Sequence, residues 1–351
     1  MNTPCGELRK LSMSVQSPSA TPTSTAATPK SSPLVGLITN QLTILLLVFI
    51  ALFFFFGSQN SRFFRTGEIS SLVVDFSGLV LLAIAETYVI VSGGIDLSVG
   101  STVAIAGVIG AEVMNHYQGH MAQTSLLLLG TVVCALVGLV VGAINAFLIT
   151  VVKMVPFVAT LITLSAGAGY ALVVSGGGDV GNNQPAIIWS STGWWIFTWL
   201  SLIVLAIAII TSVVLHFTQY GRYTFAIGSN DFAARAAGIN VKRHIASIYV
   251  LSGLLSGLVG MFWFIRIGAG SPTTDATANL EAIACVVIGG VSLTGGMGSV
   301  VGTLLGCAIL TIVTDGLVFI NVPPTWNQVV VGAIIAVAAG LQAFRGTRSR
   351  R

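Results

Sequence analysis

Charged residues are scarce in this chain of 351 residues, where Asp, Glu, Lys and Arg together make up only 7%. An ordinary soluble domain has about 25%. A soluble protein of this length needs many more polar groups to cover its surface, so most of this surface must face lipid. The scarcity excludes a cytosolic enzyme, a secreted module and a nucleic-acid-binding domain, and no nucleic-acid partner is expected.

Cysteine and histidine are also few, and their placement argues against a disulfide framework or a metal site. None of the cysteines forms a C-x-x-C pair. His116 and His120 have the i, i+4 spacing of a helical metal pair, but no third ligand stands out nearby. No histidine lies deep in an apolar run, which disfavours a membrane hydrolase that uses a Ser/His pair. No metal is expected.

A nucleotide-binding loop is missing as well. The pattern G-x-x-x-x-G-K-[ST] requires a lysine after its glycines, and the lysines of this chain are Lys10, Lys30, Lys153 and Lys242. The glycine-rich segment 175–179 lacks that lysine and is interpreted as an outer loop. The chain is therefore expected to bind no cofactor, to have no catalytic residues, and to hydrolyse no ATP by itself.

Hydrophobic sequence is what the chain has in abundance, at 54% of its residues and a mean hydropathy of +0.94. A helix needs about 20 residues to cross the hydrocarbon core. The predicted spans are residues 34–57, 69–92, 97–115, 125–150, 156–175, 195–216, 246–265, 279–293, 298–320 and 326–344. The fold class is thus all-α, a polytopic membrane protein with about ten transmembrane helices. Eight full spans are the alternative if two weaker segments do not cross.

Basic residues indicate the orientation of these spans. With both termini in the cytoplasm, the outer loops hold only Arg62, Arg65 and Arg266, and the other basic residues lie inside, as the positive-inside rule requires. The chain is thus predicted to have three regions. Residues 1–33, rich in Ser, Thr and Pro, form a disordered cytoplasmic tail. Residues 34–344 form the transmembrane domain, and residues 345–351 form a basic cytoplasmic tail.

The segment Ser92-Gly93-Gly94-Ile95-Asp96-Leu97-Ser98 separates two apolar stretches. A carboxylate at the centre of a bilayer costs roughly 3 kcal/mol, so Asp96 needs a structural reason. After a glycine break it would cap the next helix, as Ser98 also would. One interpretation places this cap at the cytoplasmic surface. The other makes the segment a discontinuous helix that lines a polar pathway, and the two are compatible.

A similar segment, Gly289-Gly290-Val291-Ser292-Leu293-Thr294-Gly295-Gly296, lies late in the chain. Aligned on the first segment, it pairs Gly93 with Gly289, Asp96 with Ser292 and Ser98 with Thr294. Glycine-interrupted segments at corresponding places in two halves indicate a transport site at a repeat interface. A chance likeness between glycine-rich helices is the alternative to such a weak internal repeat.

The longest charged stretch between spans is the loop 217–244. Either Asn230 or Asp231 is expected to cap a short helix over 231–237, which Gly238 ends. The small residues of this helix suit docking into a cleft on a partner. A solvated connecting loop is the alternative.

These three features, with Leu280-Glu281-Ala282 before the second glycine segment, occur in an order that closely resembles the ribose/xylose/arabinose-type permease family of ATP-binding-cassette importers. The resemblance covers roughly residues 40–345. It implies import of a monosaccharide or related small polyol across the bacterial inner membrane. One departure is Glu281, where Asp is common in the family, although the carboxylate is kept.

The same resemblance implies several partners. An ATP-binding-cassette ATPase subunit would hydrolyse ATP, a periplasmic or lipid-anchored sugar-binding protein would deliver substrate, and a second permease copy or a sister permease would complete the assembly in membrane lipid. The residues assigned to the ATPase-coupling loop are Gly228, Asn230, Asp231, Ala234, Arg235 and Gly238.

The candidate substrate pathway is built from polar residues in or beside the spans. They are Glu86, Asp96, Ser98, Asn145, Thr163, Glu281 and Ser292. A secondary transporter coupled to protons or sodium is the alternative function, since Glu86, Asp96 and Glu281 are intramembrane carboxylates. The loop 217–244 discriminates between the two functions, because an autonomous carrier would not need it.

Overall fold

The computed structural model describes residues 41–181, 192–274 and 277–348, so the predicted tail over 1–33 lies outside the described residues. Its helices are α2 (Gln41–Gln59), α3 (Thr66–Val91), α4 (Val99–His116), α5 (Gln123–Thr150), α6 (Pro156–Ser175), α8 (Trp199–Phe217), α9 (Gln219–Ser229), α10 (Asp231–Ala236), α11 (Val241–Ile267), α12 (Ala278–Ile288), α13 (Val300–Phe319) and α14 (Asn327–Arg348). The 3-10 helices are η1 (Ser61–Phe64) and η2 (Pro324–Trp326).

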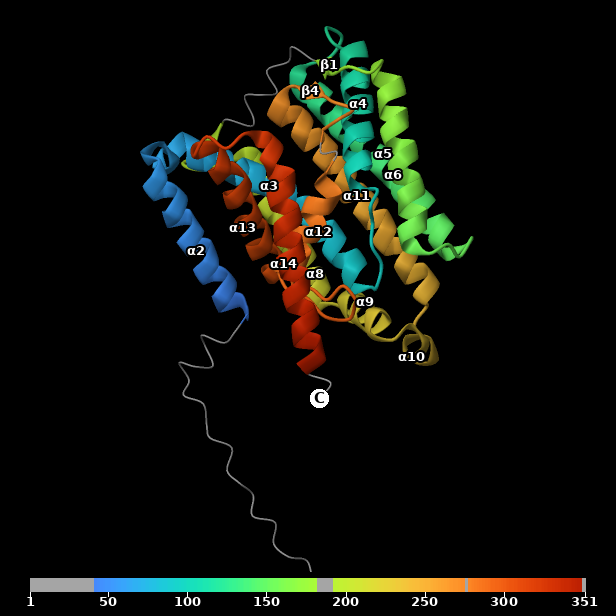
Figure 1. The fold of residues 1–351 in the computed structure, drawn as a ribbon. Helices are drawn as coiled ribbons and strands as arrows, with labels where there is room; N and C mark the ends of the chain where they lie inside the picture. The colour runs from blue at the N-terminus through green and yellow to red at the C-terminus, as the bar shows by residue number, and fades with distance from the viewer. Residues whose placement is uncertain (1–40, 182–191, 275–276, 349–351) are drawn as a thin grey trace, which may run out of the picture.

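Strands in the described residues are confined to two short antiparallel ribbons between the helices. They are β1 (Val180–Gly181) paired with β4 (Ala269–Gly270), and β2 (Gly193–Trp194) paired with β3 (Phe197–Thr198). The β1–β4 ribbon ties the connection after α6 to the connection after α11, at the top of the bundle in Figure 1. The fold is therefore all-α, as the composition predicts.

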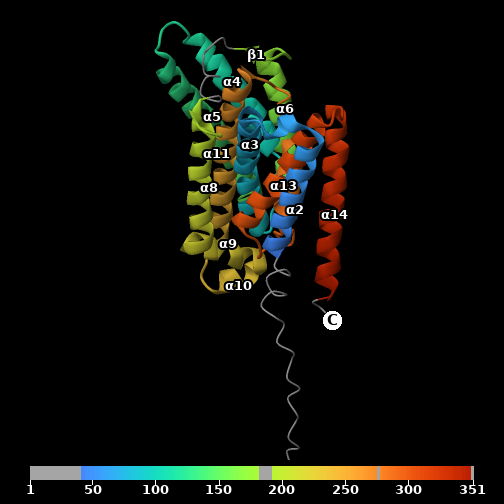
Figure 2. The ribbon, with the colours of Figure 1, turned by 90° about the vertical axis from the view of Figure 1, so that its left-hand side faces the viewer.

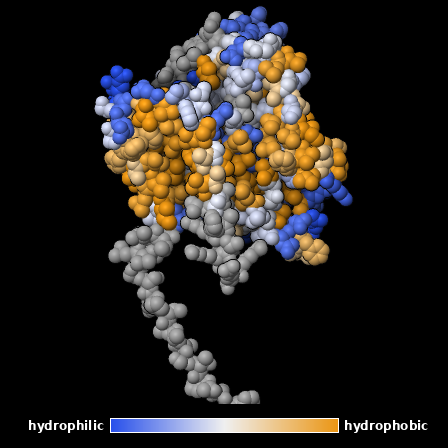
Figure 3. Space-filling view, viewed as in Figure 1, coloured by the Kyte–Doolittle hydropathy of each residue, from blue (hydrophilic) through white to orange (hydrophobic). Residues whose placement is uncertain are grey.

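Each predicted span overlaps one helix, although residues 34–40 lie outside the described residues and α12 ends at Ile288, short of the predicted end at 293. Seven helices of the described residues are long and apolar enough to cross a membrane: α2, α3, α5, α6, α8, α11 and α13. The shorter apolar helices are α12 and the Asn327–Ala338 part of α14, and α4 is largely buried within the bundle. On the face shown in Figure 3, a band of hydrophobic residues lies between two more hydrophilic ends. The polytopic membrane class is thus confirmed.

Helix α5 shows how the sequence divides into a lipid face and a packing face. Aliphatic side chains recur every fourth residue and are exposed: Leu128, Val132, Leu136, Val140 and Ile144. Small residues recur at the same interval on the buried side: Gly130, Cys134, Gly138 and Gly142. Because lipid tails are as apolar as leucine, close backbone approach through small residues holds such helices together.

Glycines bring two further pairs of backbones into direct contact. A Cβ added to Gly253 on α11 would lie 2.7 Å from the Cα of Gly142 on α5, so these two backbones touch. A Cβ added to Gly302 on α13 would lie 3.2 Å from the carbonyl carbon of Gly289, directly after α12. The first contact packs α5 on α11, and the second packs α12 on α13.

The two ends of the bundle carry different elements. Helices α9 and α10, the first turn of α2 and the C-terminal end of α14 lie at one end, and β1 and β4 lie at the other (Figures 1 and 2). Helix α3 runs toward the α10 end, and α4 runs back from it. The segment 92–98 that joins them therefore lies on the α10 side of the bundle.

Candidate functional site

Helix α3 stops at Val91 because the backbone turns at a glycine. Gly93 has a φ of +88°, a conformation that side chains with a Cβ rarely adopt. The N–H of Gly94 donates to the Val89 carbonyl at 3.0 Å, which closes the helix end. Helix α4 begins at Val99. The predicted break in the helix is thus confirmed.

Asp96 lies inside this break and is 1% exposed, so its carboxylate is buried within the bundle and does not lie at its surface. Its Oδ1 accepts hydrogen bonds from the backbone N–H of Ser98 at 3.0 Å and from the Ser98 hydroxyl at 2.6 Å. Its Oδ2 accepts from the Ser252 hydroxyl of α11 at 2.8 Å. The Asp96 backbone N–H donates to Glu86 Oε1 at 3.1 Å. The three bonds from Ser98 and Ser252 compensate for the burial of the Asp96 carboxylate.

Ser98 has a different role from the one its position predicts. It precedes α4 as the N-cap residue, but its side chain accepts no hydrogen bond from the first turn of that helix. The hydroxyl donates to Asp96 and accepts from Asn145 Nδ2 of α5 at 2.7 Å. Asn145 Oδ1 in turn accepts from the Thr163 hydroxyl of α6 at 2.7 Å. Ser98 is therefore a relay between the break and two further helices.

Five of the predicted pathway residues form one connected and buried network: Glu86, Asp96, Ser98, Asn145 and Thr163. Their polar atoms are mainly directed at one another. The network joins α3, α5, α6 and α11 around the break, so it fixes the shape of the discontinuous helix. Two buried polar atoms have no hydrogen-bond partner within the described part of the chain. One is Oε2 of Glu86, in the network itself, and the other is the hydroxyl of Tyr249 on α11.

Ser252 and Tyr249 of α11 are not among the site residues predicted from sequence. Ser252 lies in the small-residue stripe of α11, where close helix packing is a sufficient explanation for its size. Its contact with Asp96 shows that the hydroxyl has a second purpose. The sequence signal that could have identified Ser252 is a hydroxyl among the small buried residues of α11.

The second glycine segment repeats the geometry of the first. The Ser292 and Thr294 hydroxyls lie 2.8 Å apart, and the Thr294 N–H donates to Ser292 Oγ at 3.3 Å. This is the i, i+2 pattern of Asp96 and Ser98. Gly290 has a φ of +85°, which matches Gly93. The predicted pairing of Gly93 with Gly289 is thus wrong by one residue at the glycines, because the second segment is shorter there.

The two segments meet each other and α9 at what we call the glycine junction, formed by Gly93, Gly228, Gly295 and Gly296. The Gly296 N–H donates to the Val91 carbonyl at 2.9 Å, although these residues belong to different halves. A Cβ added to Gly228 would collide with the Val91 carbonyl and lie 2.6 Å from the Gly296 nitrogen. The end of α9 therefore rests directly on the backbone of both breaks.

Helix α10 confirms the predicted short helix and settles which residue caps it. The Asn230 side chain accepts from the Ala233 N–H at 3.0 Å, so Asn230 is the cap. The helix ends at Ala236, and Gly238 follows it with a φ of +84°. Asp231 and Arg235 form an exposed ion pair at 2.6 Å.

The outward face of α10 differs from the small-residue face predicted from sequence. Ala234 is 4% exposed and packs inward against Ile227 and Val241. The exposed residues include Ala233, Ala236 and Phe232, whose side chain is 78% exposed. Phe232 is thus the largest apolar side chain that α10 exposes. Phe232 is absent from the predicted coupling residues because the prediction rested on the small residues of the helix.

Helix α9 is anchored to the start of α11 by two polar contacts. The Tyr220 hydroxyl lies 3.0 Å from Ser247 Oγ, and the Thr224 hydroxyl lies 2.9 Å from His244 Nε2. Burial raises the pKa of the Tyr220 hydroxyl above its ordinary value. The tyrosine therefore stays neutral at physiological pH. Because of the two polar contacts, a movement of α9 is transmitted to the start of α11.

Glu281 and Ser292 lie apart from the network around Asp96. Ser292 is in the second break, near the α10 end. Glu281 is in the first turn of α12, where its Oε1 accepts from the Thr277 hydroxyl at 3.3 Å, and it lines a separate polar cavity. The predicted pathway residues thus fall into three groups at different places in the bundle.

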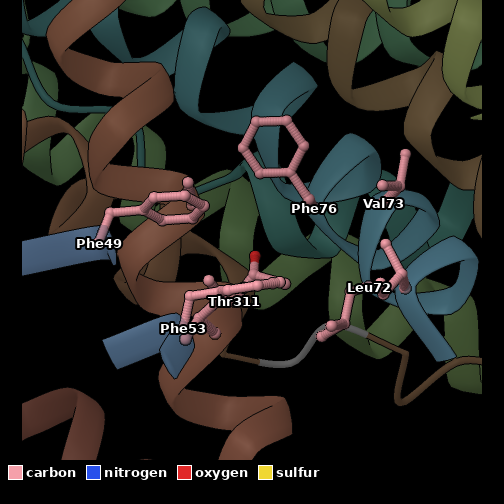
Figure 4. A pocket seen from close by; sticks show the side chains of 9 residues that line it. Phe49, Phe53, Leu72, Val73, Phe76 and Thr311 are labelled. Atoms are coloured by element: carbon pink, nitrogen blue, oxygen red, sulfur yellow. The ribbon is translucent and has the colours of Figure 1, made fainter. Parts of the chain in front are cut away.

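A large apolar groove lies between α2, α3 and α13, with a volume of about 270 Å³. Its walls come mainly from aromatic and aliphatic side chains, among them Phe49, Phe53 and Phe76 (Figure 4). Thr311 contributes a hydroxyl to the lining. The groove suits a hydrocarbon chain and gives a polar solute no set of hydrogen-bond partners among the described residues that line it.

Comparisons with known proteins agree with these features. A family model described as "Branched-chain amino acid transport system / permease component" matches residues 68–339. The galactose/methyl galactoside import permease protein MglC of Escherichia coli is 31% identical over 335 residues, which covers 92% of this chain and 98% of that protein. The ribose import permease protein RbsC of Haemophilus influenzae is 31% identical over 320 residues, 89% of this chain and 95% of that protein. The fructose import permease protein FrcC of Rhizobium meliloti is 33% identical over 310 residues, 86% and 84% respectively.

Proposed function

The chain belongs to the permease family of ATP-binding-cassette importers, and we propose that it is the membrane-spanning subunit of an importer for a monosaccharide or a related small polyol. The single observation that carries the substrate class is the set of sugar permeases aligned with the chain over nearly its whole length. The family model's description names branched-chain amino acids. The sugar class is favoured over that description, because the aligned relatives are individual transporters named for galactose, ribose and fructose.

Energy for transport comes from a partner in this proposal. The described residues offer α10 as the contact for an ATPase subunit, since α10 projects from one end of the bundle (Figure 2) and exposes Phe232. Arg222, Arg235, Lys242 and Arg243 lie in or beside α9 and α10. Under the positive-inside rule this end faces the cytoplasm, and both termini lie on that side of the bacterial inner membrane.

The glycine junction gives a physical route from the ATPase to the membrane. When the ATPase displaces α10, the joined helix α9 moves with it. Because Gly228 has no side chain, its backbone lies directly against the Val91 carbonyl and Gly296, and the displacement of α9 is transmitted to both. The two breaks in the helices then shift together, because Gly228 contacts both of them.

The remaining partners follow from the family. A periplasmic or lipid-anchored sugar-binding protein delivers the substrate at the end that carries β1 and β4, and a second permease copy or a sister permease completes the assembly. The chain itself binds no cofactor, and the ATPase hydrolyses ATP. A secondary transporter coupled to protons or sodium is not favoured, since α10 and the aligned import permeases both point to an ATP-driven assembly.

Uptake by reconstituted proteoliposomes tests this function. The full chain is reconstituted with its cognate ATPase and binding protein, and uptake of labelled D-ribose, D-galactose, D-fructose and L-leucine is measured with and without ATP inside. We expect ATP-dependent uptake of at least one sugar and none of leucine. Leucine uptake alone would overturn the substrate class. Sugar uptake by the chain alone under a proton or sodium gradient would overturn the ATP-driven mechanism.

A further inference from the structure

A polar cavity lies in the half of the bundle away from α10, between α3, α11, α12 and α13, with a volume of about 160 Å³. Its polar lining comes from Asp75, Trp263, Glu281, Thr311, Thr314 and Asp315. Glu281 is among the pathway residues predicted from sequence, whereas Asp75 and Asp315 are not, although intramembrane carboxylates are rare and usually functional. These side chains come from four helices and are far apart in the sequence.

Two polar atoms of this lining are buried without a hydrogen-bond partner in the described part of the chain: the indole Nε1 of Trp263 and Oδ2 of Asp315. Buried donors and acceptors are rarely left unpaired, because the loss of hydration is costly. One of these atoms is a donor and the other an acceptor. The cavity thus offers complementary groups to a ligand that can both accept and donate hydrogen bonds.

The charges around the cavity are only partly compensated. Arg266 pairs with Asp75, with N–O distances of 3.1 and 3.2 Å. Asp315 interacts electrostatically with Asp75, Glu281 and Arg266, and within the described ranges no second basic residue does so. The Thr314 hydroxyl lies 3.1 Å from two main-chain carbonyl oxygens of its own helix, and it also interacts with the Asp315 carboxyl group. Carboxylate acceptors therefore outnumber the donors that the protein supplies.

A metal ion does not fit this arrangement. Among the described residues, no three His, Cys, Asp or Glu side chains are grouped closely enough to hold one. The carboxylates instead surround a cavity of about 160 Å³. This volume is roughly ten times the space that holds one buried water molecule, and a sugar ring with its hydroxyl groups is of similar size. Hydroxyl groups donate to carboxylates and accept from an indole N–H, and the aromatic ring with Leu79 and Leu82 gives apolar walls.

We infer that this cavity is a binding site for the polyhydroxylated solute on its way through the membrane, with Asp315, Glu281 and Trp263 as its direct contacts. The inference rests on the proposed function and adds the place where the substrate is held. In the proposed orientation the cavity lies in the periplasmic half of the bundle. It is therefore the first polar site that the solute reaches after the binding protein releases it. The network around Asp96 then belongs to the shape of the helices and not to substrate binding.

Transport kinetics of the full importer test this site. The variants are Asp315→Asn and Trp263→Phe, which keep the size of each side chain close to the original while changing its hydrogen bonding. The matched control is Glu112→Gln, an exposed carboxylate on α4 outside the cavity. Uptake of labelled D-ribose, D-galactose and D-fructose is measured in membrane vesicles that contain the ATPase and binding protein, and rates are normalised to the amount of permease.

We expect both cavity variants to raise the sugar concentration for half-maximal uptake about tenfold or more, since each removes a hydrogen bond made to a substrate hydroxyl. Abundance and co-purification of the ATPase should stay at the level of the unaltered chain, and Glu112→Gln should behave like that chain. A second variant, Thr314→Cys, allows a direct measurement, because a bound sugar should slow its modification by a small thiol reagent.

The outcomes separate this inference from the proposed function. If the unaltered importer takes up sugar and the cavity variants keep its half-saturation concentration, the cavity is a structural or water-filled space and the inference is wrong while the function stands. Loss of abundance with an unchanged half-saturation concentration, and no protection of Thr314→Cys by sugar, would also show that the inference is wrong. If the unaltered importer takes up none of the sugars, both fall together.

Discussion

The backbone N–H of Gly296 donates to the Val91 carbonyl at 2.9 Å, and this bond joins the two interrupted helices of the chain across more than half its length. Val91 is the last residue of α3, and its carbonyl has no partner in the next turn because the helix ends there. Gly296 supplies that partner from the second break. The two segments thus complete each other, and Gly228 of α9 touches both.

The first prediction concerns this contact. Gly228→Ala places a Cβ where the Val91 carbonyl lies, so the junction must open. Overpacking of this kind costs about 1–3 kcal/mol. We expect ATP-dependent uptake to fall by more than tenfold, with a lower melting temperature of the purified chain. The control is Gly169→Ala on α6, where a Cβ has nothing within 4 Å. Equal uptake by both variants would remove the junction from the coupling route.

The second prediction concerns Asp96. In Asp96→Asn the amide oxygen still accepts from Ser98, and the Ser252 hydroxyl rotates to accept from the amide nitrogen. We therefore expect normal abundance and much of the uptake. Asp96→Leu leaves the Ser98 and Ser252 donors unpaired in a buried site, which costs about 3 kcal/mol, and both abundance and uptake should fall. Immunoblots of membranes and vesicle uptake measure this. A complete loss of uptake in Asn at normal abundance would instead show that the charge itself is required.

The sequence predicts the breaks in the helices well, because glycine pairs inside apolar runs have a local meaning. Gly93 and Gly290 both take positive φ values that favour glycine. The register of the repeat could not be predicted to the residue, since either glycine of a pair can make the turn. A helix end that closes one residue later shifts every glycine pairing without changing the sequence pattern.

The partners of Asp96 could not be predicted in the same way. Asn145, Thr163 and Ser252 lie on three different helices, and only the packing of those helices on α4 brings them together. The sequence shows which polar residues lie in spans, but not which of them face one another. The separation of Glu281 from this network has the same cause, because it depends on how α12 packs against α3 and α13.

The third prediction concerns Phe232, the exposed aromatic residue on α10. Phe232→Ala removes apolar area that a partner would cover, and burial of a phenylalanine contributes about 1.5–3 kcal/mol. We expect affinity for the ATPase subunit to fall roughly tenfold or more. Co-purification and a binding titration in detergent measure this. The control is Phe157→Ala, an exposed phenylalanine in the first turn of α6. Unchanged association in both variants would show that Phe232 lies outside the contact.

The last prediction separates the two faces of α10. Ala234 is buried against Ile227 and Val241, so Ala234→Trp forces α10 away from α9 and α11. This variant should lose stability of the cytoplasmic region and ATPase association together. Ala236 is exposed on the same helix, and Ala236→Trp should leave the folded chain intact while its bulk obstructs the partner. Limited proteolysis of the loop reports the first effect, and co-purification of the ATPase reports the second. If Ala236→Trp binds the ATPase as well as the unaltered chain does, and transports at the same rate, then the partner contacts another face of α10. Resistance of Ala234→Trp to proteolysis would show that the inward packing of α10 adds little, since the helix would then tolerate displacement from α9.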